Sequence, residues 1–273
     1  MQNTLQPTIL QHICPALRLV KYNEIPAIML QHEVGTAVIA LQGAHLLSWQ
    51  PKGSEHDVLW LSDIEPFQLG SAIRGGIPLC YPWFGAVKSP SHGTARIRLW
   101  HLIDYAISAD NVQLAFGLFT EDHLIEAKVS MHFSEDCQVI FTHYGQEEAQ
   151  VALHSYFQIG DIQQIEIQDL PISCVDNVTK QIEQVPSPRK IQQHVDCTYQ
   201  VTEAKTTILD PVLQRAIYLE HQHASEVVVW NPWHKATSGM SEFGYQTMLC
   251  VETARITHTL KQGEQIAVKI KLK

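Results

Sequence analysis

The sequence predicts an all-β fold, a large antiparallel β-sandwich formed by a single domain over residues 1–273. Two segments, 127–134 and 266–273, alternate apolar and polar residues, as expected for a strand with one buried and one solvent-facing side. Many further short runs of apolar or β-branched residues are separated by turn-forming residues, and few windows have a helical period. Because 45% of the residues are hydrophobic, the chain can form a sizeable core.

The individual elements follow from the same patterns. In the first alternating segment, the apolar side is formed by Ala127, Val129, Met131 and Phe133. A short helix is expected near 234–243, and the polar, proline-rich stretch 185–190 predicts a loop inside the domain. In chain order, strands are expected at 35–41, 57–61, 112–120, 127–134, 137–144, 149–159, 164–168, 215–220, 226–230, 247–253 and 266–273.

Charge and cysteine usage narrow the class of protein. A net charge of −9 argues against nucleic acid or an anionic membrane surface as the main partner. No run approaches the 18 apolar residues of a membrane span, and the N-terminus lacks the pattern of a signal peptide. Six dispersed cysteines without a C-x-x-C pair predict reduced thiols in a cytoplasmic protein. The sequence leaves the oligomeric state open, and we favour a monomer.

The stretch 73–85, IRGGIPLCYPWFG, departs most clearly from strand patterning. Its two glycines permit unusual backbone conformations and close approach of a ligand, and its two prolines stiffen the chain. Arg74 adds a planar set of donors that suits phosphate or carboxylate. The stretch predicts one wall of an anion-binding pocket. A packed crossover loop, in which the arginine meets a structural carboxylate, is an equally good interpretation of the composition.

A second polar stretch, SHGTARIRLW at 91–100, places His92 beside a glycine and adds Arg96 and Arg98. The two arginines alternate in a strand-like run, so they are expected to share a face, and only one of them needs to turn inward. Taken alone, the stretch would favour a solvated basic strand.

Three further residues stand out as candidates for chemistry. His154 is expected mid-strand among apolar residues, where a histidine is more often part of the core, but its ordinary pKa makes it the first candidate for proton transfer. Glu252 follows an apolar run and needs a partner or a function. Partial burial would raise its pKa, as suits a general base, whereas a salt bridge to Arg255 or Lys261 is the structural alternative. Asp196 would be unremarkable by itself.

No pattern supports a metal, a nucleotide or a serine nucleophile. His221 and His223 could offer two metal ligands, but no third ligand has an informative spacing. The sequence contains no phosphate-binding glycine loop and no G-x-S-x-G nucleophile motif. We therefore expect an activity that needs no cofactor.

Five stretches, in this order, resemble the glucose-6-phosphate 1-epimerase branch of the aldose 1-epimerase family. They are IRGGIPLCYPWFG, SHGTAR, ALHSYFQIGDI, VVVWNP at 227–232 and CVET at 250–253, and the resemblance runs from about Val34 to the C-terminus. It implies a galactose mutarotase-like supersandwich, which agrees with the strand patterns. It also implies a sugar-phosphate substrate, with glucose 6-phosphate expected, and cofactor-free interconversion of its α and β anomers.

The resemblance implies a role for each candidate residue. Glu252 would be the general base that deprotonates the anomeric hydroxyl, and His154 the general acid that protonates the ring oxygen. His92 would bind the sugar near its reacting oxygens, and Asp196 would hold a sugar hydroxyl. The resemblance implies that a pair of arginines, Arg74 and Arg96, forms the phosphate clamp.

Three departures leave the substrate open. Thr94 replaces a common aromatic residue, Cys197 follows Asp196 where many relatives carry arginine, and the stretch 240–245 is shorter than usual. One alternative is a mutarotase for an unphosphorylated aldose such as galactose, which would not need two arginines. The other is a non-catalytic sugar-binding or metabolite-sensing β-sandwich, which would typically lack one member of the acid–base pair.

Overall fold

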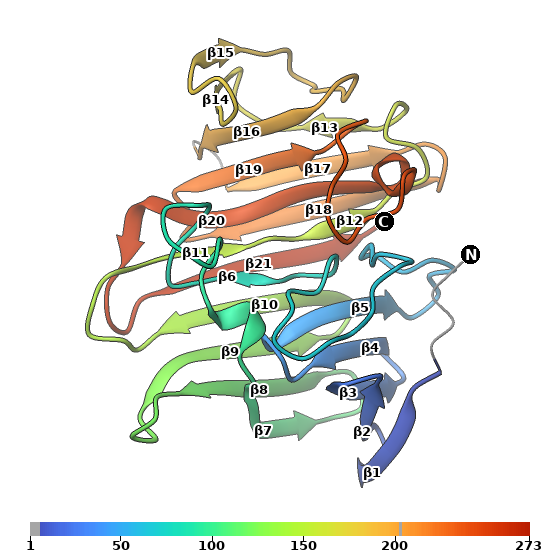
Figure 1. The fold of residues 1–273 in the computed structure, drawn as a ribbon. Coiled ribbons are helices and arrows are strands. Elements are labelled where there is room, and N and C mark those ends of the chain that lie inside the picture. Colours follow the sequence, from blue (N-terminus) through green and yellow to red (C-terminus); the bar gives the residue numbers. More distant parts are fainter. Residues whose placement is uncertain (1–5, 202–203) are drawn as a thin grey trace.

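The computed structural model describes residues 6–201 and 204–273, which form three antiparallel sheets (Figure 1). The first sheet is a meander of the five N-terminal strands, each paired with the next along the chain. Its strands are β1 (Thr8–Cys14), β2 (Leu17–Tyr22), β3 (Ile25–His32), β4 (Gly35–Ala40) and β5 (His45–Pro51).

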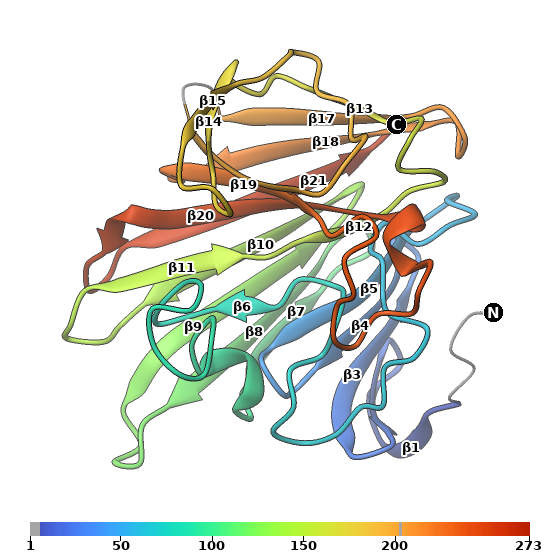
Figure 2. The same cartoon turned by 45° about the horizontal axis from the view of Figure 1, so that its top comes forward.

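The second sheet has eight strands in the order β13-β17-β18-β21-β10-β9-β8-β7. It is the long sheet that runs through the molecule in both views (Figure 2). Its strands are β7 (His101–Ile107), β8 (Val112–Phe119), β9 (Ile125–Phe133), β10 (Asp136–His143), β13 (Glu166–Gln168), β17 (Lys205–Asp210), β18 (Arg215–Gln222) and β21 (Gln265–Leu272).

The third sheet carries the candidate site residues of the C-terminal half. Its order is β15-β14-β16-β19-β20-β11-β6, and β12 also pairs with β20. Its strands are β6 (Leu79–Cys80), β11 (Ala149–Leu153), β12 (Tyr156–Gln158), β14 (Ser173–Asp176), β15 (Ile182–Gln184), β16 (Val195–Gln200), β19 (Glu226–Asn231) and β20 (Met248–Leu260).

The expected all-β class is therefore confirmed, and so are the two alternating segments. On β9, the residues of the predicted apolar side are at most 1% exposed and belong to the main core, together with Ile266, Val268 and Ile270 of β21; they are Ala127, Val129, Met131 and Phe133. Alternation arises because successive side chains of a strand point to opposite sides, and only one side of these strands faces the core. The core also includes residues of the first and third sheets, such as Ile28 and Val229.

Two expected elements are wrong. The segment 57–61 is not a strand, because its residues form isolated bridges from Leu59 to Phe157 and from Leu61 to Gly75. No helix forms over 234–243, where the backbone makes turns. A helical turn follows instead in the 3₁₀ helix η2 (Gly244–Thr247), and Gly239 has a positive φ of 74°, which a continuous helix does not allow.

Two other expectations need correction. The run around Arg96 and Arg98 is not a strand but begins with the 3₁₀ helix η1 (Ala95–Ile97). The strand expected over 149–159 is divided into β11 and β12, with His154 and Ser155 between them. By contrast, the proline-rich stretch 185–190 is a connection between β15 and β16, as expected, and Arg189 within it bridges to Ile167.

The remaining structural expectations concern thiols and membranes. All six cysteines lie within the described residues, and each is a free thiol. Within 6–201 and 204–273, no helix is long and apolar enough to cross a membrane.

Candidate active site

The register of the third sheet creates the site. On β20, Leu249 and Val251 point into the main core, so Cys250 and Glu252 point to the other side of the sheet. Cys250 lies opposite Trp230 of β19 and Tyr156 of β12. Trp230 in turn lies opposite Asp196 of β16, so one row of side chains crosses four strands on the outer side of the sheet.

His154 lies next to this row, on the same side of the sheet, although it lies outside a strand. Leu153 pairs with Thr253 and Tyr156 pairs with Cys250, so the antiparallel register continues unchanged across the gap and sets His154 opposite Glu252. His154 Nε2 lies 3.2 Å from Glu252 Oε1. The two residues are 8% and 1% exposed, respectively. Two residues almost one hundred positions apart therefore form a buried pair.

Burial shifts both members of the pair toward their neutral forms. It raises the pKa of Glu252 well above its ordinary value, and the nearby carboxylate of Asp196 adds to this effect. Burial also lowers the pKa of His154, to which His92, Arg74 and Arg96 contribute. Since the two groups are in contact, their protonation is coupled, and burial favours the neutral carboxyl and the neutral imidazole.

The pair also has unused hydrogen-bonding capacity. Glu252 Oε2 and His154 Nδ1 are buried and have no hydrogen-bond partner among the described residues. Such atoms are costly unless a ligand or water satisfies them.

The alternative that Glu252 forms a salt bridge with Arg255 or Lys261 is wrong. Arg255 points to the other side of β20 and contacts Glu264 at 3.3 Å, and the main-chain N–H of Lys261 also donates to Glu264. A salt bridge to either residue therefore does not explain the carboxyl of Glu252.

Arg74 reaches the site from the connection between β5 and β6. Its Nη1 donates to the Tyr156 hydroxyl at 2.8 Å, and its Nε donates to the Ser238 carbonyl at 3.1 Å. Its main-chain N–H donates to Glu65 Oε2 at 2.8 Å. The two interpretations of this stretch are thus compatible, because a structural carboxylate binds the loop while the guanidinium acts on the histidines of the site.

His92 packs against the catalytic candidate from a tight loop. Its φ is 61° and that of Gly93 is 76°. A Cβ on Gly93 would lie 2.0 Å from the Tyr81 carbonyl oxygen, so only glycine permits this approach. The imidazole of His92 meets that of His154 edge-on, with ring centroids 5.8 Å apart.

The protonation state of His92 follows from its surroundings. Burial, with Arg96 and Arg74 nearby, lowers its pKa to about 4, so the ring is neutral at neutral pH. Its Nδ1 accepts the Gly85 N–H at 3.3 Å. The proton therefore resides on Nε2, which leaves this nitrogen as a donor.

The two arginines near His92 have different partners. Arg96 donates through Nη2 to the Ser91 carbonyl at 2.7 Å and lowers the pKa of both His92 and His154. Arg98 instead binds Glu126 at 2.7 Å and the Phe119 carbonyl. The expectation that the two share a face is wrong, since the helical turn η1 directs them apart, and only Arg96 belongs to the site.

Asp196 completes the group on β16. Its Oδ1 accepts a hydrogen bond from the side-chain amide of Asn177 at 2.8 Å, and its charge helps to raise the pKa of Glu252. The amide of Asn177 is therefore a neutral hydrogen-bond partner of the Asp196 carboxylate. Cys197, the next residue, is 2% exposed and belongs to the main core.

All six residues singled out in the sequence thus gather around one pair. The sequence analysis missed several residues that contact them. Tyr156 follows His154 by two positions, so the strand period could have placed it on the same side. Asn177 and Ser238 gave no such signal, because turns far away in the chain bring them there. The residues missed are Tyr156, Asn177, Trp230 and Ser238. Trp60 in turn stacks on Tyr156.

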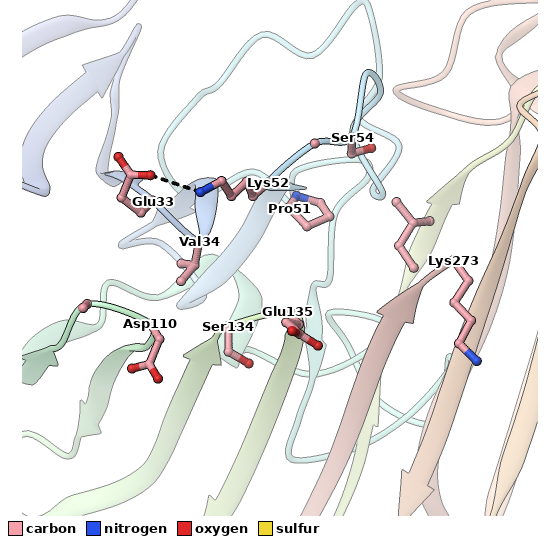
Figure 3. Close-up of a pocket in the computed structure, with 12 residues that line it drawn as sticks. Glu33, Val34, Pro51, Lys52, Ser54, Asp110, Ser134, Glu135 and Lys273 are labelled. Carbon is pink, nitrogen blue, oxygen red and sulfur yellow. Dashed lines mark hydrogen bonds and ion pairs between the residues drawn. The ribbon is translucent and has the colours of Figure 1, made fainter.

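Other parts of the structure offer less. A surface pocket of about 500 Å³, shown in Figure 3, lies among strand-connecting turns and the C-terminus, and none of the six candidate residues lines it. Among the described residues, no group of three or more histidine, cysteine, aspartate or glutamate side chains could hold a metal ion.

A buried histidine–glutamate pair thus lies on the outer side of an antiparallel sheet, in an all-β fold shared with mutarotase-like proteins. The chain belongs to the aldose 1-epimerase family, whose model matches residues 26–273.

Individual relatives agree with this assignment. A Haemophilus influenzae protein named "Putative glucose-6-phosphate 1-epimerase" is 53% identical over 270 residues, covering 98% of this chain and 100% of that one. An Escherichia coli protein of the same name is 36% identical and covers 93% and 91%.

Solved structures share the fold. The crystal structure of HI1317 has a TM-score of 0.97 and 57% identity, and covers 98% of this chain and 100% of its own. YeaD of Salmonella typhimurium, called a "putative mutarotase", has a TM-score of 0.92 and 31% identity, with coverages of 97% and 96%.

Proposed function

We propose that the protein interconverts the α and β anomers of glucose 6-phosphate by acid–base ring opening and reclosure. The observation that carries the proposal is the buried contact between His154 and Glu252, with two arginines nearby. A neutral aldose would not need these arginines, and a sugar sensor would not need both members of the pair.

Ring opening uses the carboxylate–imidazolium form of the pair. Glu252 accepts the proton of the anomeric hydroxyl as His154 donates its proton to the ring oxygen, and the bond between C1 and that oxygen breaks. The resulting aldehyde turns about the C1–C2 bond. Reclosure then reverses both proton transfers and gives the other anomer, so the pair ends with the single proton with which it began.

The neighbouring residues orient the sugar. The Nε2–H of His92 donates to an oxygen near the reacting centre, and Asp196 accepts from a sugar hydroxyl. Glu252 Oε2, which has no partner within the described residues, is available to the anomeric hydroxyl. Positioning of this kind turns proton transfer into a local step.

The phosphate is bound by Arg74 and Arg96. Because the protein has a net charge of −9, a phosphate dianion is repelled by the molecule as a whole and must be attracted by fixed cations close to it. Arg74 is held at Nε and Nη1, which leaves its remaining N–H groups for the ligand. A guanidinium can donate two charge-assisted hydrogen bonds to one phosphate.

Substitution of these arginines tests the proposal. We expect Arg74→Ala and Arg96→Ala each to lower kcat/KM for glucose 6-phosphate by about 10–100-fold, mainly through KM, because the phosphate is remote from the anomeric carbon. Turnover of free glucose should barely change. Anomer exchange of both sugars, followed by NMR, measures the difference.

Arg98→Ala provides a matched control, since Arg98 lies two positions after Arg96 but forms a salt bridge with Glu126. It should alter neither substrate's kcat/KM. Equal losses on both sugars in the Arg74 and Arg96 variants would contradict phosphate specificity and favour a neutral aldose as substrate.

The pH dependence of kcat gives a second prediction. Activity requires a single proton on the pair, so the rate should rise to a plateau and fall again. The acid limb, where the pair gains a second proton, should lie below pH 6.5 because burial lowers the pKa of His154. The alkaline limb, where the pair loses its proton, should lie well above pH 4.5 because burial raises the pKa of Glu252.

Free glucose is the substrate for this measurement, because a sugar phosphate itself titrates near pH 6. A rate that climbs continuously from pH 5 to pH 9 would contradict a one-proton pair.

A further inference from the structure

Tyr156 contacts both halves of the proposed site. Its hydroxyl accepts the hydrogen bond from Arg74 Nη1 at 2.8 Å. Its ring stacks on the imidazole of His154, with centroids 4.8 Å apart and an interplanar angle of 13°. One side chain therefore joins the arginine assigned to the phosphate and the histidine assigned to the ring oxygen.

The surroundings hold Tyr156 in place. It is 2% exposed, and its main-chain N–H donates to the Gly76 carbonyl, two residues beyond Arg74. Its ring also stacks with that of Trp60, at 5.9 Å and 23°, and meets Trp230 edge-on at 6.1 Å. A ring packed among aromatic neighbours has few alternative positions.

The hydroxyl of Tyr156 is a buried anchor for Arg74. Arg74 Nε donates to the Ser238 carbonyl, which lies on an exposed connection between β19 and β20. Without the hydroxyl, Arg74 would depend on an exposed loop for its orientation. An arginine that must first be ordered by its ligand binds more weakly than one already in place.

We propose that Tyr156 is a positioning residue that fixes Arg74 relative to His154, so that a bound phosphate places the sugar ring against the acid–base pair. This inference rests on the proposed function, because it assigns the phosphate to Arg74. Tyr156 does not act as an acid or base: burial raises the pKa of its hydroxyl, which keeps it a neutral phenol at neutral pH.

The substitution Tyr156→Phe separates the two contacts. It removes only the hydroxyl, so the stack on His154 is retained while Arg74 loses its buried acceptor. We expect KM for glucose 6-phosphate to rise about tenfold with kcat nearly unchanged, and the turnover of free glucose to remain as in the wild type. If the hydroxyl only supported the fold, its removal would change the turnover of both sugars.

Coupling to Arg74 provides a sharper measurement. If the hydroxyl acts through Arg74, then Tyr156→Phe should cost nothing further in an Arg74→Ala background, so the two losses should not add. Binding of 1,5-anhydroglucitol 6-phosphate, which lacks the anomeric hydroxyl, should weaken by the same factor in calorimetry. Binding of unphosphorylated 1,5-anhydroglucitol should not weaken.

Tyr199→Phe is the matched control. Tyr199 is also a buried tyrosine of the third sheet, but it lies in the main core among apolar side chains. It should leave KM for both sugars unchanged. Thermal melting of both variants checks that each is folded.

The outcomes distinguish this inference from the proposed function. If Arg74→Ala shows no phosphate-specific loss, the phosphate assignment and the proposed function fail together. If Arg74→Ala shows that loss but Tyr156→Phe binds the anhydroglucitol phosphate as tightly as the wild type, only the role of Tyr156 is overturned. Additive losses in the double variant would overturn it as well.

Discussion

Glu252→Gln is expected to lower kcat by about 10²–10⁴-fold while the sugar phosphate still binds. Glutamine keeps the shape of the side chain on β20 but cannot accept the proton of the anomeric hydroxyl. Within the described residues, no other carboxyl forms an ion pair with His154. A steady-state comparison of kcat and KM, together with calorimetric binding of a non-reacting sugar phosphate, measures the effect.

The stability of this variant is a control for its fold. Burial raises the pKa of Glu252 in the folded state above its pKa in the unfolded chain. As the pH rises above the pKa of the unfolded chain, ionisation of this carboxyl therefore lowers the free energy of unfolding. Removing the ionisable group should therefore not lower Tm at neutral pH, and any gain should be larger at higher pH.

Glu264→Gln is the matched substitution at a carboxylate that binds Arg255 instead. It should leave kcat unchanged. A folded Glu252→Gln protein with near-wild-type kcat would remove Glu252 from the mechanism.

His154→Gln should lower kcat by a similar factor of about 10²–10⁴, because glutamine cannot deliver a proton to the ring oxygen. The acid limb of the pH profile, which is assigned to the imidazole of His154, should disappear. The double variant with Glu252→Gln should lose much less than the product of the two single losses, since both groups act in one step.

His132→Gln, on the outer side of β9, is the control for this substitution and should retain full activity. Losses that multiply in the double variant would mean that the two residues act independently, which contradicts a shared proton.

The strand patterns allowed part of the fold to be predicted. Alternation identified β9 and β21, where one side meets the core and the other meets solvent. It did not identify the N-terminal strands β1, β2 and β3, which were absent from the expected elements. It also wrongly predicted a strand at 57–61. In this apolar run, one main-chain N–H donates to the Trp49 carbonyl and another to the Tyr156 carbonyl, so the run does not pair continuously with one strand. Local pattern reports which residues are buried, whereas a strand also requires a continuous partner.

The site residues could be selected only through the motifs of the resemblance, because the strand patterns indicate residue types alone. By pattern, Arg96 and Arg98 are equivalent, and only the resemblance selects Arg96. In the structure the helical turn η1 separates them: one lies beside His92 and the other binds Glu126. The same holds for the structural alternative to Glu252, which was excluded by the side of β20 on which Arg255 lies.

The sequence by itself determined the all-β class, the resemblance to aldose 1-epimerases, and the kinds of side chain available for proton transfer and anion binding. These depend on local alternation and on short motifs, which are readable along the chain. Only the tertiary structure decided that His154 lies opposite Glu252, that Asp196 stands close enough to affect its pKa, and that Tyr156 joins Arg74 to the pair. These contacts join strands and loops that are far apart in sequence, and strand register and packing, which no local pattern encodes, set them.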